Sequence, residues 1–167
     1  TSTWNRTECF LSPDGGYDFT KQAGQQWFMN AARERGVNDF LFFTNSAPYF
    51  MTRTGSTLSG DSEYINLQDD KFDDFANFLV RCVQHFRENG YNIKYVSPLN
   101  EPNVEWHTNS WQEGTFATKA DIYRMVAELD KAISESGADT KIVIPEMGEM
   151  KMLFEVADNE RIPDDII

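Results

Sequence analysis

The segment FDDFANFLVRCVQHFRENGYNIKYVSPLNEP, residues 72–102, has the clearest structural pattern in the chain. Its first half places apolar side chains three and four positions apart, the spacing of one face of an amphipathic helix. These side chains are Phe72, Phe75, Leu79, Cys82, Val83 and Phe86. Gly90 follows as a helix-terminating residue, and residues 93–97 form a short apolar run typical of a buried parallel strand. The segment therefore predicts a helix, a tight turn and a strand.

The same order of helix, glycine and short apolar run occurs three times along the chain. Helices are predicted over residues 20–36, 69–90 and 118–137, and buried strands over residues 40–44, 93–97 and 141–145. The apolar face of the last helix is formed by Ile122, Met125, Val126, Leu129 and Ile133. This alternation is typical of an α/β fold with a parallel sheet, either an open doubly wound sheet or a (β/α)8 barrel. Residues 1–19 are predicted as a loop segment, and residues 20–167 as βα units.

Composition indicates an acidic globular protein and disfavours two classes of partner. The chain has 27 acidic and 15 basic residues, a net charge of −12, which disfavours nucleic acid. Apolar residues make up 40% of the chain, enough for a sizeable core. The longest apolar runs, such as residues 40–43, are far shorter than the ~18 residues of a membrane helix, so no membrane partner is predicted.

Cofactor and metal signatures are missing from the sequence. It has no glycine-rich phosphate-binding fingerprint, and His85 and His107 have no second ligand at metal-site spacing. We therefore predict no cofactor and no metal. Cys82 lies on the apolar helix face, where a buried hydrophobe is expected, and Cys9 lies in a loop. The sequence leaves open whether these two cysteines pair.

Glu101 is the strongest candidate for a catalytic residue. It follows Asn100 in the stretch SPLNEP, residues 97–102, directly after a predicted buried strand. Functional loops lie at the carboxyl ends of parallel strands in both architectures. A carboxylate held there suits general acid/base catalysis, and the neighbouring amide can bind a substrate hydroxyl. The alternative, a capped loop with a solvated glutamate, is disfavoured by the preceding strand and the aromatic residues that follow.

Other candidate binding residues lie in the loops after the first two strands. Asn45 either binds a substrate hydroxyl or caps a turn. Tyr49 belongs to the aromatic stretch that follows it. Trp106 and Trp111 either stack on a sugar ring, whose C–H face matches an aromatic surface, or serve ordinary loop packing.

Glu146 offers a second carboxylate, after the third predicted strand. Neighbouring strands are about 4.8 Å apart, so Glu101 and Glu146 can in principle approach the ~5–5.5 Å separation of the two carboxyl groups in a retaining glycosidase. The alternative for Glu146 is a substrate-binding or supporting role, and spacing alone leaves both open.

Four stretches, taken together and in order, resemble glycoside hydrolase family 30, and most closely its endo-β-1,6-galactanase-like members. They are AGQQWF (residues 23–28), NSAPYFMT (45–52), SPLNEP (97–102) and QEG (112–114). The resemblance implies a (β/α)8 TIM barrel in which the three predicted strands are the third, fourth and fifth. It also implies cleavage of β-linked galactan or a related polysaccharide with retention of configuration, by a secreted or periplasmic enzyme.

The resemblance also implies roles for individual residues. The family's acid/base glutamate follows an asparagine at the tip of the fourth strand, which corresponds here to Glu101. The family nucleophile lies on the seventh strand, beyond this chain, and Glu146 does not match it. The expected substrate-binding residues are Asn45, Tyr49, Asn100, Trp106 and Glu146.

About three βα units fill less than half of an eight-unit barrel. Residues 1–167 are therefore expected to be an internal fragment of a glycosidase catalytic barrel, incomplete and inactive on its own. Its expected partners are the polysaccharide or oligosaccharide substrate and the remainder of the same enzyme. The alternative is a non-catalytic carbohydrate-binding α/β domain, whereas a nucleotide-binding domain is disfavoured by the missing glycine fingerprint.

Overall fold

The computed structural model describes residues 8–58, 64–104, 106, 112–144 and 146–148. Helices and strands alternate along it as α1 (Ala23–Glu34), β1 (Phe40–Phe43), α2 (Phe72–Glu88), β2 (Ile93–Ser97), α3 (Lys119–Ser136) and β3 (Lys141–Ile142). A short 3-10 helix, η2 (Tyr49–Met51), lies in the loop after β1. The three predicted helix–strand repeats are therefore confirmed.

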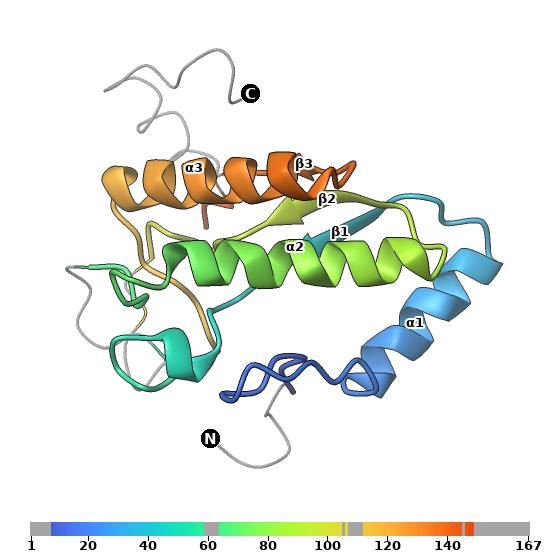
Figure 1. Ribbon diagram of the computed structural model, residues 1–167, viewed down its shortest axis with the longest axis horizontal. Coiled ribbons are helices and arrows are strands. Elements are labelled where there is room, and N and C mark those ends of the chain that lie inside the picture. The colour runs from blue at the N-terminus through green and yellow to red at the C-terminus, as the bar shows by residue number, and fades with distance from the viewer. Residues whose placement is uncertain (1–7, 59–63, 105, 107–111, 145, 149–167) are drawn as a thin grey trace.

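The three strands form one parallel sheet in the order β1–β2–β3. Phe43 pairs with Ser97, and Val96 pairs with Ile142. Helices α2 and α3 lie side by side along the sheet (Figure 1). Because the strands are parallel, their carboxyl ends meet at one edge of the sheet, and the loops that follow them can share a site. The predicted α/β class with a parallel sheet is confirmed.

The core lies between the central strand and the two neighbouring helices. Ile93 and Val96 of β2 have no exposed surface. All six predicted apolar positions of α2 are buried, and so are four of the five in α3, with Ile133 half-buried. The apolar spacing in the sequence therefore identified the correct face of both helices, because that face packs on the sheet.

Left-handed glycines end the three helices, as the sequence predicts. Gly36, Gly90 and Gly137 have φ angles of +88°, +83° and +66°.

The start of one helix agrees with the prediction, whereas the other two begin later than predicted. At α3, the Thr118 hydroxyl accepts from the Asp121 amide and the Asp121 carboxylate accepts from the Thr118 amide, a capping box that begins the helix as predicted.

Helices α1 and α2 each begin three residues later than predicted, at Ala23 and Phe72. Neither has a side-chain hydrogen bond at its N-cap. Thr20, the predicted start of the first helix, instead donates its hydroxyl and its amide to Asp18 in a preceding turn. A local hydrogen bond of this kind competes with helix formation.

The outer strands differ from the buried strands that the sequence predicts. In β1, Leu41 and Phe43 are 46% and 43% exposed, because they point to the face of the sheet opposite to the one where Phe40 and Phe42 pack on the core. Strand β3 ends at Ile142, three residues before the predicted end. The Val143 amide still donates to Val96, so the chain continues alongside β2 beyond the strand.

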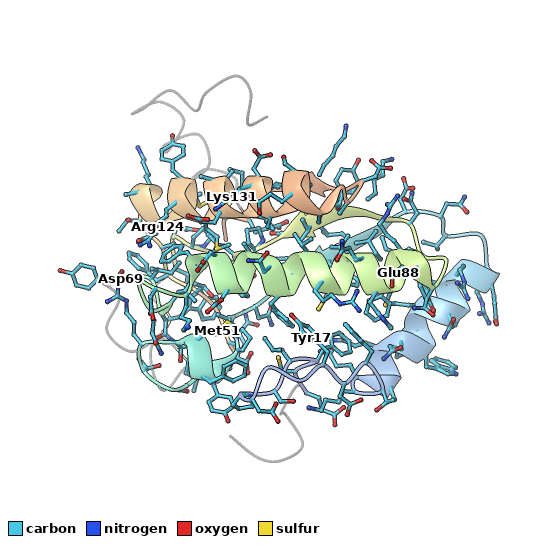
Figure 2. All side chains as sticks on the ribbon, viewed as in Figure 1. Tyr17, Met51, Asp69, Glu88, Arg124 and Lys131 are labelled. Atoms are coloured by element: carbon cyan, nitrogen blue, oxygen red, sulfur yellow. The ribbon has the colours of Figure 1, made fainter. Side chains whose placement is uncertain are left out.

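The segment before α1 covers one side of α2. Phe10 packs against Phe86 at 5.7 Å between ring centroids, and Tyr17 lies below α2, stacked on Phe78 (Figure 2). Cys9 and Cys82 are both free thiols. Burial raises the pKa of the Cys82 thiol far above its ordinary value, which agrees with the predicted role of a buried hydrophobe.

Candidate active site

The candidate site is the edge of the sheet where the three strands end. The amide and the hydroxyl of Thr44, after β1, both donate to the carbonyl of Ser97 at the end of β2, at 3.2 and 2.9 Å. After β2, the amide of Glu101 donates to the carbonyl of Glu146 at 2.7 Å. Main-chain hydrogen bonds therefore hold the three tips together past the last paired residues of the strands.

Glu101 lies at the centre of this edge in an unusual backbone conformation. Its φ is +45°, in the left-handed region that non-glycine residues rarely adopt, at a cost of about 1–3 kcal/mol. Its carbonyl accepts from the Val104 amide at 2.9 Å and from Nε1 of Trp106 at 3.3 Å. These bonds, with the one to Glu146, hold the residue in the turn, and strained residues of this kind cluster at functional sites.

The Glu101 carboxyl lies against Gly148, beyond the end of β3. A Cβ atom at position 148 would come within 3.5 Å of the Glu101 carboxyl carbon and of one carboxyl oxygen, and 3.1 Å from a Val104 methyl. The Gly148 amide also donates to the Asn103 side chain at 3.1 Å. The Glu101 carboxyl therefore reaches across the tip of the neighbouring strand, where a Cβ at position 148 would touch it and would crowd Val104.

Glu146 approaches Glu101 through its main chain. Besides the hydrogen bond to the Glu101 amide, residue 146 forms an isolated parallel bridge with Asn100. The structure therefore brings the main chains of the two glutamates together at the tips of neighbouring strands. A retaining pair of these two carboxylates stays a hypothesis from the sequence.

Thr115 joins the two predicted sugar-binding asparagines. Its hydroxyl donates to the carbonyl of Asn45 at 3.0 Å, and its amide donates to the carbonyl of Asn100 at 3.3 Å. Asn100 is buried and Asn45 is exposed. Sequence reasoning missed Thr115, which is 5% exposed, because a threonine in a loop has no periodicity that points to its partners.

Glu113, two residues earlier, joins the same loops through its side chain. One carboxylate oxygen accepts from the Ser46 hydroxyl at 2.9 Å, and the other accepts from the Thr57 hydroxyl at 2.8 Å. The signal that pointed here was the stretch QEG, although no role was assigned to its glutamate. Asn66, also missed, organises the far part of the loop after β1, since its side chain accepts from the Thr54 amide and donates to the Ser56 carbonyl.

The aromatic candidates differ in exposure. Tyr49 is 52% exposed on η2, with its ring edge-on to Phe50, so one aromatic surface remains open to a ligand. Trp106 is only 5% exposed, and its indole packs so closely on Gly114 that a Cβ there would lie 2.0 Å from the ring. Packing of the loop is therefore the role that the structure gives Trp106, and sugar stacking by it stays a prediction. His107 and Trp111 lie outside the described residues.

A hollow in the described part of the chain lies away from Glu101. It measures about 420 Å³ between α1, β1 and α2, and its lining is largely aromatic and aliphatic, with Phe10, Met29, Phe42 and Phe86 among the residues. Within the described ranges, no three His, Cys, Asp or Glu side chains are grouped so that they could hold a metal ion. Nor is any helix in that part of the chain long and apolar enough to cross a membrane.

The chain belongs to O-glycosyl hydrolase family 30, whose family model matches residues 1–166. It is similar to a solved structure of a conserved exported protein from Bacteroides fragilis, with 72% identity and a TM-score of 0.89. That match covers 99% of this chain and 34% of the other. The predicted resemblance to this family is therefore confirmed.

Two characterised relatives act on β-1,6-linked galactose, according to their names. An exo-beta-1,6-galactobiohydrolase of Bifidobacterium longum is 32% identical over 117 residues, which are 65% of this chain and 7% of the relative. An endo-beta-1,6-galactanase of Hypocrea rufa is 26% identical over 124 residues, 72% of this chain and 26% of the relative. The chain thus spans about a quarter or less of these two relatives.

Proposed function

We propose that this chain carries the general acid/base of a retaining glycoside hydrolase that cleaves β-linked galactan or a related polysaccharide. Glu101 is that acid/base. The observation that carries the proposal is the place of Glu101, which follows Asn100 at the carboxyl end of the central strand and lies in a left-handed turn fixed by three hydrogen bonds. Family membership and the activities named for the two relatives support the reaction and the substrate class.

In the proposed reaction, Glu101 first donates its proton to the glycosidic oxygen as the bond to the anomeric carbon breaks. A carboxylate from outside this chain attacks that carbon and forms a glycosyl-enzyme ester. Glu101, now ionised, then takes a proton from water as the water oxygen attacks the anomeric carbon. The bond from that carbon to the enzyme carboxylate breaks, and the second inversion restores the original configuration. Asn100 and Asn45 bind sugar hydroxyls, Tyr49 and Trp106 contact the sugar, and Glu146 supports the substrate from the neighbouring strand.

We further propose that the chain is an internal part of a (β/α)8 barrel in a secreted or periplasmic enzyme. The exposed side chains of β1 and the absence of any buried residue on α1 support a continuation of the sheet and helix layer on that side. An eight-stranded barrel closes such an edge. The export of the Bacteroides fragilis protein supports the location. Under this proposal the nucleophile comes from outside residues 1–167, and the isolated chain is inactive.

The proposal is tested by measuring the turnover of the Glu101→Gln variant in the full-length protein that carries this chain. Turnover of a β-1,6-linked galacto-oligosaccharide is expected to fall by roughly 10²–10⁴-fold, the usual loss for a general acid. An aryl galactoside with a good leaving group needs less protonation, so its glycosylation step is expected to suffer less. Near-normal activity on the oligosaccharide, or equal losses on both substrates, would remove Glu101 from the acid role.

A further inference from the structure

Residues 113–115 contact both loops that carry the candidate sugar-binding groups. We call these three residues the clasp. The Glu113 carboxylate accepts hydrogen bonds from the hydroxyls of Ser46 and Thr57. The Trp106 ring packs on Gly114. Thr115 donates hydrogen bonds to the carbonyls of Asn45 and Asn100. Each member of the clasp therefore contacts a segment that lies next to Asn45 or Glu101.

Glu113 is the charged member of the clasp, and both of its carboxylate oxygens are engaged. Ser46 lies next to Asn45 in sequence, and Thr57 lies eleven residues further on, near the middle of the same loop. Hydrogen bonds to a charged acceptor are stronger than those between neutral groups, and both bonds here are partly buried. Glu113 therefore holds the start and the middle of the loop after β1 against the loop after β2.

The clasp is also connected to Glu101, through Trp106. Nε1 of Trp106, whose ring lies on Gly114, donates to the carbonyl of Glu101. The position of Asn45 relative to Glu101 thus depends on contacts that pass through residues 113–115. A displacement of about 1 Å between groups that act on one substrate can cost on the order of 10²-fold in rate.

We propose that Glu113 is a positioning residue, which rests on the proposed function of Glu101. It acts on no proton of the substrate. It fixes the loop of Asn45 and Tyr49 relative to the segment of Asn100 and Glu101, and so sets the distance between the sugar-binding groups and the acid.

The test compares Glu113→Ala with Glu113→Gln in the full-length protein, on the β-1,6-linked galacto-oligosaccharide. Glu113→Ala is expected to lower kcat/KM by roughly 10–100-fold, with a higher KM as well as a lower kcat. Glu113→Gln is expected to recover most of this loss, because its amide oxygen accepts from one hydroxyl and its amide nitrogen donates to the other. The pH profile of kcat/KM is expected to keep both its acidic and its basic limb in the two variants, because Glu113 transfers no proton.

A loss of folded protein alone would lower the apparent kcat and leave KM unchanged, so a rise in KM separates positioning from stability. Adding Ser46→Ala to Glu113→Ala is expected to cause no further loss, because both changes remove the same hydrogen bond. If Glu113→Ala does not fold, Ser46→Ala and Thr57→Val remove the two hydroxyls one at a time and are each expected to raise KM several-fold. Glu135→Ala, on the exposed face of α3, is the matched control and should behave as the wild type.

Three results would overturn the assignment: a Glu113→Ala variant within twofold of the wild type in kcat/KM, additive losses for Ser46→Ala, or a limb missing from the Glu113→Gln pH profile. Glu101→Gln is measured in the same series to separate the two proposals. An active wild type that loses activity with Glu101→Gln but tolerates Glu113→Ala overturns the positioning role alone. An inactive wild type, or a fully active Glu101→Gln, overturns the proposed function and with it this role.

Discussion

The main-chain amide of Glu101 donates to the main-chain carbonyl of Glu146 at 2.7 Å, across the tips of β2 and β3. This bond belongs to the backbone on both sides, so a change of the Glu146 side chain leaves it in place. The two glutamates can therefore be tested independently, although they are neighbours.

Glu146→Ala in the full-length protein is expected to reduce kcat/KM by about tenfold or less, the effect of one lost substrate hydrogen bond. External azide is expected to restore no activity to this variant. A mechanism-based inhibitor is expected to label a glutamate outside this chain. Mass spectrometry of the labelled protein makes the measurement. Inhibitor found on Glu146, or product recovered with azide, would make Glu146 the nucleophile and contradict the assignment from the family.

Gly148→Val is expected to lower kcat by at least tenfold, because the new side chain would take the space of the Glu101 carboxyl and of Val104. Gly148→Ala is expected to have a smaller effect in the same direction. Steady-state kinetics and a thermal melt of each variant check this. Gly24→Ala is the control, since a Cβ at that helical position meets nothing within 4 Å. It should keep full activity, and equal losses at both positions would argue against displacement of the acid.

Leu129→Ala is expected to destabilise the protein by about 2–5 kcal/mol, because Leu129 has no exposed surface and lies in the core between α3 and the sheet. Chemical denaturation followed by circular dichroism measures the loss. The exposed Glu135→Ala variant on the same helix should stay within about 0.5 kcal/mol of the wild type. A loss below 1 kcal/mol for Leu129→Ala would show that the core is packed differently.

Alkaline pH is expected to destabilise the fold. Burial raises the pKa of Cys9, Tyr17 and Cys82 above their ordinary values, so these groups stay protonated in the folded state while the unfolded chain loses its protons. The unfolded state then binds fewer protons, and the free energy of unfolding falls as pH rises above about 9. Urea titrations from pH 7 to 11 measure the slope. Cys82→Val should make it shallower, and an unchanged slope in this variant would contradict the burial of the thiol as its cause.

Local periodicity in the sequence determined most of the architecture. The apolar spacing from Phe72 to Phe86 predicted the buried face of α2, because one face of a helix must pack on the sheet. Gly36, Gly90 and Gly137 marked the helix ends, because they occupy left-handed conformations that other residues avoid. The position of Asn100 and Glu101 after β2 was also predictable, since the end of a buried strand can be read from a run of apolar residues.

Tertiary structure alone decided how the loops meet. The exposure of Leu41 and Phe43 in β1 depends on which face of the sheet the rest of the protein covers. The hydrogen bonds of Glu113 to Ser46 and of Thr115 to Asn45 join residues that lie far apart in the sequence. Such contacts have no period along the chain. They form only after the sheet has brought the strand ends together, so the sequence could name the residues at this edge but not their partners.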